Sequence, residues 1–144
     1  MKVFLASDHA GFELKGKLLA HLKARGYEVK DYGPLALNPR DDYPETIRPL
    51  AHGVVLEGAM GVAIGLSGEG EAMAANRVKG IRAAEYYGGP TEILTLSRQH
   101  NDSNVLALGA RFVSEKEAIA AVELWLGTPF SGEERHKRRI QELG

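Results

Sequence analysis

The stretch Gly61-Val-Ala-Ile-Gly-Leu-Ser-Gly-Glu-Gly-Glu-Ala-Met-Ala-Ala-Asn76 passes from an apolar run through a glycine-rich polar turn into a series of small residues. Residues 62–66 are apolar on both alternations, which is typical of a strand that helices cover on both faces. Gly68 and Gly70 let the backbone turn tightly after that strand. The stretch therefore predicts a strand, a loop and a helix in succession.

The loop in the middle of this stretch could hold negative charge. The N–H groups that follow Ser67 lie at the start of the predicted helix, where they have no partner within the helix and face outward at the positive end of its dipole. Such groups bind an anion or stabilise an oxygen that develops negative charge during a reaction. Glu71 stands in the first turn of the same helix.

Two other interpretations fit the same residues. Gly68-Glu-Gly-Glu-Ala-Met73 could be a dinucleotide-binding fingerprint, but its last position is Met rather than Gly or Ala, and the loop follows a middle strand rather than the first. The loop could also be a plain helix start, with Ser67 as the N-cap and Glu71 as a favourable charge. This loop alone does not decide between the three interpretations.

The composition limits the classes of protein to consider. The 144 residues correspond to one domain, which we expect to span residues 1–144. The chain has no cysteine, which excludes disulfides, thiolate nucleophiles and cysteine-based zinc sites. No stretch approaches the ~20 apolar residues of a membrane span, and nothing resembles a signal peptide, so we expect a cytoplasmic protein that does not bind membranes.

Strands and helices alternate along the chain. Besides residues 62–66, we expect strands at residues 2–7, 27–32, 81–86 and 104–108. Helices separate these strands, and the capping-box patterns Ser114-x-x-Glu117 and Ser131-x-x-Glu134 start the last two helices. This alternation predicts a Rossmann-like three-layer α/β/α sandwich around a five-stranded parallel sheet.

Several polar residues follow the predicted strands directly. Ligands of such sheets bind outside the carboxyl ends of the strands, so residues at these ends can line one edge. His100 does not fit this arrangement, because it precedes the last strand and should lie at the opposite edge of its own sheet. The residues that can line the first edge are Asp8, His9, Ser67, Glu71 and Arg111.

Each of these patterns also has a simpler explanation. Asp8 and His9 could be a helix cap and a surface histidine, and His100 could belong to a polar helix end. Arg135 and Arg139 share one helix face, which could be a solvated tail, a nucleic-acid patch or a clamp for one phosphate group. The net charge of −1 and the lack of interleaved aromatic residues argue against nucleic acid.

A metal site is the remaining possibility for the polar residues. None of the possible ligands forms a tight spacing such as His-x-x-x-His, and the loop before Glu71 already offers an electrophile without a metal. We therefore expect neither a metal nor another cofactor. The possible ligands are Asp8, His9, His52, His100, Asp102 and His136.

Taken together, six motifs resemble the family of type B ribose-5-phosphate isomerases, which also contains isomerases of galactose and allose 6-phosphates. The resemblance covers about residues 2–143 and is specific as a set. The motifs are Ser7-Asp-His-Ala-Gly-Phe-Glu-Leu-Lys15, Asp42-Tyr-Pro44, Gly65-Leu-Ser-Gly-Glu-Gly-Glu71, Ala75-Asn76, Ser97-Arg-Gln-His-Asn-Asp102 and Arg135-His-Lys-Arg-Arg139.

The resemblance implies a five-stranded parallel sheet of order 2-1-3-5-4. It also implies interconversion of ribose 5-phosphate and ribulose 5-phosphate through a cis-enediol, without metal or cofactor. Many members carry a cysteine base where this chain has Gly65, whereas others carry a glutamate within Ser-Gly-x-Gly-Glu, a position that Glu71 occupies. The resemblance thus indicates Glu71 as the base, Ser67 as a proton carrier between the substrate oxygens, and the N–H groups of Gly68 and Gly70 as an oxyanion hole.

The resemblance also implies a homodimer or tetramer whose active sites are shared between two subunits. The C-terminal helix, at about residues 132–143, would cross the dimer interface and bring its arginines to the partner's site. Ring opening is implied for His100, with Asp8 opposite, Tyr43 nearby and Asn101 on an enediol oxygen. The residues implied for the phosphate group are His9, Arg111, Arg135 and Arg139.

Two alternative functions stay open from the sequence. The same site could isomerise hexose 6-phosphates such as allose or galactose 6-phosphate. The glycine-rich loop could instead belong to a non-catalytic nucleotide-binding module.

Overall fold

The computed structural model describes residues 1–144 and consists of five strands and six α-helices. The strands are β1 (Lys2–Ser7), β2 (Glu28–Asp31), β3 (Met60–Gly65), β4 (Ala83–Tyr86) and β5 (Val105–Gly109). The helices are α1 (Phe12–Ala24), α2 (Pro44–Glu57), α3 (Glu69–Asn76), α4 (Glu92–Asn101), α5 (Glu115–Leu126) and α6 (Glu134–Leu143), with a short 3-10 helix, η1, at His9–Gly11.

The five strands form one parallel sheet in the order β2-β1-β3-β5-β4, which confirms the predicted topology. Ser7 pairs with Ile64, and Ile64 pairs with Leu108. Because of this register, the carboxyl ends of β1, β3 and β5 lie level at one edge of the sheet. The polar residues that follow these strands are therefore delivered to the same place.

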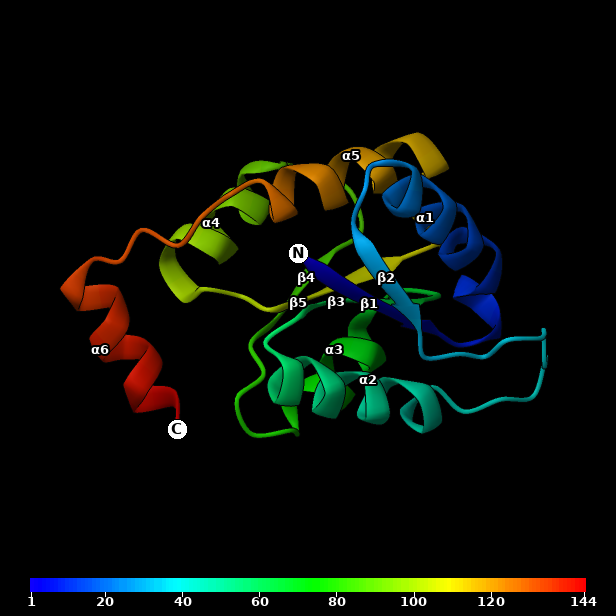
Figure 1. Ribbon diagram of the computed structural model, residues 1–144, viewed down its shortest axis with the longest axis horizontal. Helices are drawn as coiled ribbons and strands as arrows, with labels where there is room; N and C mark the ends of the chain where they lie inside the picture. The colour runs from blue at the N-terminus through cyan, green and yellow to red at the C-terminus, as the bar shows by residue number, and fades with distance from the viewer.

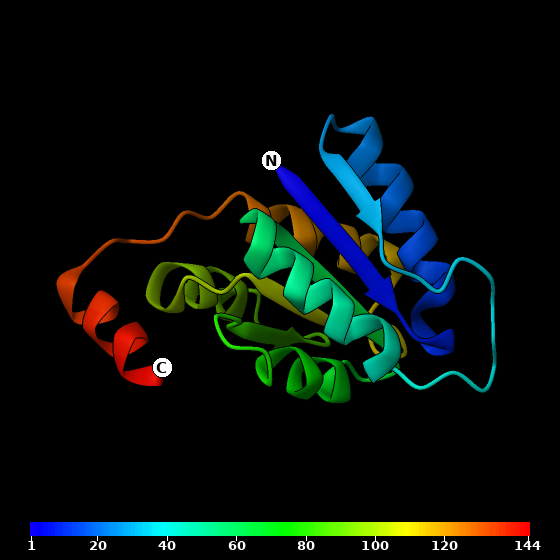
Figure 2. The ribbon, with the colours of Figure 1, turned by 60° about the horizontal axis from the view of Figure 1, so that its bottom comes forward.

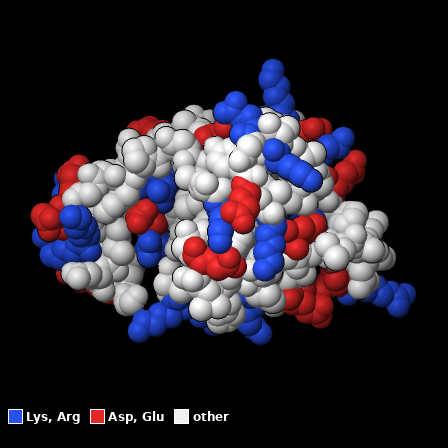
Figure 3. Space-filling model, viewed as in Figure 1, with Lys and Arg blue, Asp and Glu red and all other residues white.

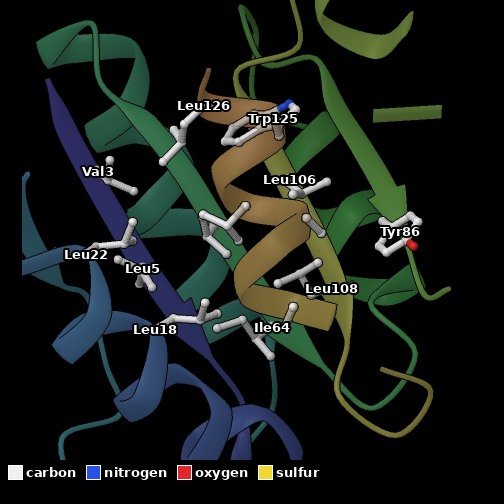
Figure 4. Packing of buried hydrophobic residues seen from close by; sticks show 14 of the residues in the cluster. Val3, Leu5, Leu18, Leu22, Ile64, Tyr86, Leu106, Leu108, Trp125 and Leu126 are labelled. Atoms are coloured by element: carbon white, nitrogen blue, oxygen red, sulfur yellow. The ribbon is translucent and has the colours of Figure 1, made fainter. Parts of the chain in front are cut away.

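Helices cover both faces of the sheet, as the sandwich prediction requires (Figure 1). Helices α1, α4 and α5 pack on one face, where Leu18, Leu94 and Trp125 join alternate strand residues in one apolar cluster. Figure 4 shows Leu18 and Trp125 within this cluster. Helices α2 and α3 pack on the other face, around Ile47 and Ala75. The alternation of strand side chains between the two clusters is what places both helix layers.

Helix α6 stands away from the two layers, at one end of the molecule (Figures 1 and 2). His136 is its only buried residue, and the other side chains of the helix are exposed or half-buried. The helix therefore contributes little to the core of its own chain. None of the helices is both long and apolar enough to cross a membrane.

One of the two predicted capping boxes is confirmed. Ser114 Oγ accepts the N–H of Glu117, and the Glu117 carboxylate accepts the N–H of Ser114, both at 3.1 Å. The second prediction is wrong, because α6 begins at Glu134 after an N-cap at Glu133 that makes no side-chain cap. The Ser131 hydroxyl instead bonds His136 Nδ1 at 2.9 Å and accepts the N–H of Glu133 at 3.3 Å, so other local contacts take the place of the predicted capping box.

A buried hydrogen bond links the α5 layer to the start of β5. Trp125 is fully buried, and its indole N–H donates to Ser103 Oγ at 2.8 Å. Ser103 Oγ also lies 3.0 Å from Ser97 Oγ on α4. Two helices and one strand thus meet at a single hydroxyl group.

We expect Ser103→Ala to lower the free energy of unfolding by about 1–3 kcal/mol, because it leaves the buried indole N–H without an acceptor. Urea denaturation of Ser103→Ala, Trp125→Phe and the double variant measures the coupling. The double variant should lose less stability than the sum of the two single losses. Strict additivity would show that this hydrogen bond does not contribute.

Candidate active site

Asp8 directly follows β1 and is buried at the edge of the sheet. Its N–H donates to the carbonyl of Ile64 on β3 at 3.3 Å. Its Oδ1 accepts the N–H groups of Ala10 and Gly11 at 2.9 and 3.2 Å, so the side chain caps η1. A Cβ atom at Gly11 would overlap the Ile64 carbonyl, so only glycine permits this close approach. The chain turn fixes the Asp8 carboxylate beside β3.

The loop after β3 presents unpaired N–H groups. Gly68 adopts a left-handed conformation (φ +85°) and is the N-cap of α3, which contradicts the alternative interpretation in which Ser67 is the N-cap. The Ser67 hydroxyl accepts the N–H of Glu69 at 3.2 Å instead. The N–H groups of Ser67, Gly68 and Gly70 have no acceptor within the chain. These three donors at the positive end of α3 form a site for an anion or an oxyanion.

Glu71, in the first turn of α3, is almost fully buried, and its Oε2 atom has no hydrogen-bond partner. Its carboxylate lies over Gly65, the last residue of β3, where a Cβ atom would overlap Oε1. Burial raises the pKa of Glu71 above its usual value, and the nearby charge of Asp8 raises it further. Such a carboxylate is a stronger base than an exposed one once it is ionised.

Two further predicted residues lie beside the same loop. The Tyr43 ring packs against Gly70, whose Cβ position would be 2.6 Å from Tyr43 Cζ. The Arg111 N–H donates to the carbonyl of Leu66 at 3.1 Å, and the Arg111 side chain is exposed. Both residues therefore border the loop that carries the free N–H groups.

His9 is held by a residue that sequence reasoning missed. Asp41 Oδ1 lies 2.8 Å from His9 Nδ1 and also accepts the His9 N–H at 3.0 Å. This hydrogen bond raises the pKa of His9, which favours the cationic imidazolium that an anionic ligand requires. The only signal for Asp41 in the sequence is its place in the polar loop before α2, which does not reveal its partner.

Four of the predicted site residues lie elsewhere in this chain. Asn101 ends α4, and its carbonyl accepts from Arg82 Nε at 2.8 Å, just before β4 begins. His100 is next to Asn101, while Arg135 and Arg139 lie on α6. The structure thus confirms that His100 lies at the amino-terminal edge of its own sheet, and it does not bring these four residues to Glu71.

His100 pairs with a second histidine. Its ring lies 4.4 Å from the ring of His136, centroid to centroid. Burial lowers the pKa of His136, and the charge of His100 lowers it further. The lowered pKa favours the neutral imidazole, whose Nδ1 bonds the Ser131 hydroxyl. Sequence reasoning had considered His136 only as a possible metal ligand.

A hollow of about 880 Å³ lies between α6 and residues 76–84, away from Glu71. Figure 3 shows this hollow between the helix and the rest of the molecule, with both basic and acidic side chains at it. The basic residues of its lining are Arg77, Lys79 and Arg82. No group of three or more His, Asp or Glu side chains is arranged to hold a metal ion.

Comparison with known proteins gives a consistent result over the whole chain. The family model "Ribose/Galactose Isomerase" matches residues 3–143. Ribose-5-phosphate isomerase B of Mycobacterium tuberculosis is 40% identical over 144 residues, which cover 99% of this chain and 88% of that protein. Ribose-5-phosphate isomerase B of Escherichia coli is also 40% identical, over 99% of this chain and 93% of that protein.

Solved structures show the same similarity. Ribose-5-phosphate isomerase B of Mycoplasma genitalium with bound ribulose-5-phosphate matches with a TM-score of 0.93 at 39% identity, over 99% of this chain and 93% of that chain. The Clostridium thermocellum enzyme of the same name matches with a TM-score of 0.94 at 40% identity, over 100% of this chain and 95% of that chain.

We expect Gly65→Ala to push the Glu71 carboxylate out of its buried position, because the new methyl group occupies the same space. The pKa of Glu71 should then fall toward its ordinary value, since burial is the main cause of its rise. The pH titration of the Glu71 ¹³Cδ resonance measures this change. Gly16→Ala is the control, because a Cβ atom there meets nothing. An unchanged Glu71 titration in Gly65→Ala would contradict this placement.

Proposed function

The chain belongs to the ribose/galactose isomerase family, and on that premise we propose that it interconverts D-ribose 5-phosphate and D-ribulose 5-phosphate with Glu71 as the base. The supporting observation is the buried Glu71 carboxylate beside three free N–H groups. A base and an oxyanion hole at one point of a crevice are what an enediol reaction needs. The related Mycoplasma genitalium enzyme has been solved with bound ribulose-5-phosphate.

Proton transfer within the open-chain sugar is the central step of the proposal. Glu71 removes the proton from C2, the C–H electron pair forms the C1=C2 bond, and the aldehyde oxygen O1 gains negative charge. The N–H groups of Ser67, Gly68 and Gly70 stabilise this oxygen, each by roughly 3 kcal/mol. The Ser67 hydroxyl carries a proton from O2 to O1, and Glu71 returns its proton to C1. No proton or electron is gained or lost overall.

The position of Glu71 supports the glutamate form of this chemistry over the cysteine form. A side chain at residue 65 would occupy the space that the Glu71 carboxylate fills. Gly65 therefore leaves room for a base that comes from α3 rather than from β3. Because the pKa of Glu71 is raised and the base must be ionised, the rate should fall with decreasing pH earlier than for an exposed glutamate.

Ring opening and phosphate binding complete the proposal. His100 would donate to and accept from the ring atoms, with Asp8 opposite, Tyr43 nearby and Asn101 on an enediol oxygen. The phosphate group would be held by cations, each forming a charge-assisted hydrogen bond. The raised pKa of His9 supports its part in this set. The proposed phosphate ligands are His9, Arg111, Arg135 and Arg139.

These roles require two chains at each site. In one chain His100, Arg135 and Arg139 lie away from Glu71, and α6 stands apart from the core (Figure 2). A homodimer with two-fold symmetry would bring α6 of one chain to the sheet edge of the other, and would do so twice. In this arrangement residues 1–144 fold as one domain, and α6 crosses the interface. A tetramer would contain two such dimers.

A second substrate class deserves a direct comparison, because the matching family model names both ribose and galactose isomerases. A hexose 6-phosphate would place its phosphate one carbon farther from the reacting carbons. Comparing kcat/KM for ribose 5-phosphate and allose 6-phosphate distinguishes the two classes. A higher value for the hexose would replace the proposed substrate without changing the reaction type.

We expect the purified chain to convert ribose 5-phosphate in a coupled assay and to incorporate deuterium from heavy water into the product. Glu71→Gln should reduce kcat by at least about a thousandfold while leaving binding of ribose 5-phosphate nearly intact, because the amide keeps the shape and loses the base. Calorimetry on the variant measures that binding. Activity of Glu71→Gln within tenfold of the wild type would assign the base to another residue.

We also expect Glu71→Gln and Arg139→Ala to complement each other. Each homodimer should be nearly inactive, because every site carries one defect. When the two chains are unfolded and refolded together, about half of the dimers are mixed and hold one intact site of two, which gives about a quarter of wild-type activity.

Mass spectrometry confirms the mixed dimers in this experiment. If they form and the activity stays at the level of the two parents, Arg139 serves the site of its own chain. Refolding Glu71→Gln with itself is the matched control.

A further inference from the structure

A second buried carboxyl group lies next to the proposed oxyanion hole. Glu85 is on β4, and neither of its carboxyl oxygens has a hydrogen-bond partner, although both are shielded from solvent. Its neighbour Tyr86 joins the cluster under α5, whereas Ala83 packs with the α2 and α3 cluster. By alternation, Glu85 faces α3. The sequence alone showed a polar residue on an edge strand and gave no reason to single it out.

The Glu85 carboxyl group packs against the loop at Gly68. A Cβ atom built on Gly68 would lie 2.9 Å from both Glu85 oxygens and 2.9 Å from the carbonyl carbon of Leu108 on β5. Gly68 is therefore packed between the Glu85 carboxyl group and the end of β5. Gly68 is the residue whose left-handed conformation turns the chain and starts α3. The support of this one residue sets the direction of the free N–H groups.

We propose that Glu85 is a positioning residue for the isomerisation proposed above: its carboxyl group, packed beneath Gly68, holds the loop so that the N–H groups of Ser67, Gly68 and Gly70 meet the substrate oxygens. The role of the loop rests on the proposed function. The packing of Glu85 against Gly68 does not.

The charge state of Glu85 follows from what surrounds it. The charged groups that act on it are Glu69 and Glu71 on α3, both acidic, and β5 beside it is apolar from Val105 to Gly109. Burial and then these two charges raise the pKa of Glu85 to about 8. At neutral pH it is thus an uncharged acid, which is far less costly to bury without a partner than a carboxylate.

Ionisation of Glu85 would oppose the reaction. Above about pH 8 its negative charge would lie beneath the same N–H groups that stabilise the enediolate. The charge would compete for those groups and repel the oxyanion. The rate of the proposed isomerisation should therefore fall as Glu85 loses its proton. The affinity for substrate should change less, because it depends on the distant phosphate ligands.

Kinetics from pH 6 to 10 with ribose 5-phosphate separate positioning from simple space filling. Glu85→Ala should lower kcat by roughly 10- to 100-fold at pH 7, with less effect on KM, because the loop loses its support. Glu85→Gln should restore kcat to within a few-fold of the wild type and remove the decline above pH 8. Glu69→Gln should move the decline to lower pH, because the charge of Glu69 raises the pKa of Glu85. Glu28→Gln, an exposed glutamate on the opposite edge strand, is the control with an unchanged profile.

The amide resonances of Gly68 and Gly70 provide a readout that does not depend on catalysis. Without substrate, they should shift between pH 7 and 9 in the wild type and stay in place in Glu85→Gln. If the wild type converts no sugar phosphate but these resonances shift as expected, the proposed function fails and only the support of the loop by Glu85 stands. The positioning role is wrong if kcat of Glu85→Gln declines above pH 8 as in the wild type. It is also wrong if the amide resonances of Gly68 and Gly70 shift with pH in Glu85→Gln as they do in the wild type.

Discussion

The level carboxyl ends of β1, β3 and β5 are the constraint on which the site depends. Their register pairs Ser7 with Ile64 and Ile64 with Leu108, so the three strands end at one edge. The chain leaves β1 toward α1 on one face of the sheet and leaves β3 toward α3 on the other face. Neighbouring loops that diverge in this way open a crevice at the point where the strand order reverses. Asp8 stands on one side of the crevice and Glu71 on the other, and no separate binding element is needed to create it.

The edge is also where the fold departs from what stability alone would favour. Glu71 lies near Asp8 on one side and near Glu85 on the other, and both Glu71 and Glu85 keep buried carboxyl oxygens without partners. The positive end of α3 offsets part of this cost, and the raised pKa of Glu71 and Glu85 shows that it does not offset all of it. Local violations of packing and hydrogen-bonding rules are expected where a protein carries out chemistry. Here they coincide with the free N–H groups of the loop.

The sequence was sufficient for the elements whose signal is local. The apolar run before Ser67 and the alternation of strands and helices predicted the sheet and both helix layers, and strand ends marked Asp8 and Glu71 as site residues. The predicted Ser131 cap is wrong because the hydroxyl bonds the side chain of His136, five residues along the chain, and not the N–H of Glu134. Asp41 and Glu85 could not be predicted from the sequence for a different reason. Their importance comes from contacts with His9 and Gly68, which lie far away in the sequence, and neither residue belongs to a local pattern.

The distribution of charge extends the argument from one chain to two. The sheet edge holds the buried residues Asp8 and Glu71 and the exposed Glu69 around the loop, whereas α6 exposes the basic residues Arg135, Lys137, Arg138 and Arg139. In the proposed dimer these surfaces face each other across the substrate. Before substrate binds, Glu69 would attract the arginines and help to orient the encounter of the two chains. The phosphate group would then replace Glu69 as the partner of the arginines, and Glu71 would face the reacting carbons. In the proposed dimer the same cations would therefore serve assembly and substrate binding in turn, and a helix with a single buried residue in its own chain would gain its packing partner from the other chain.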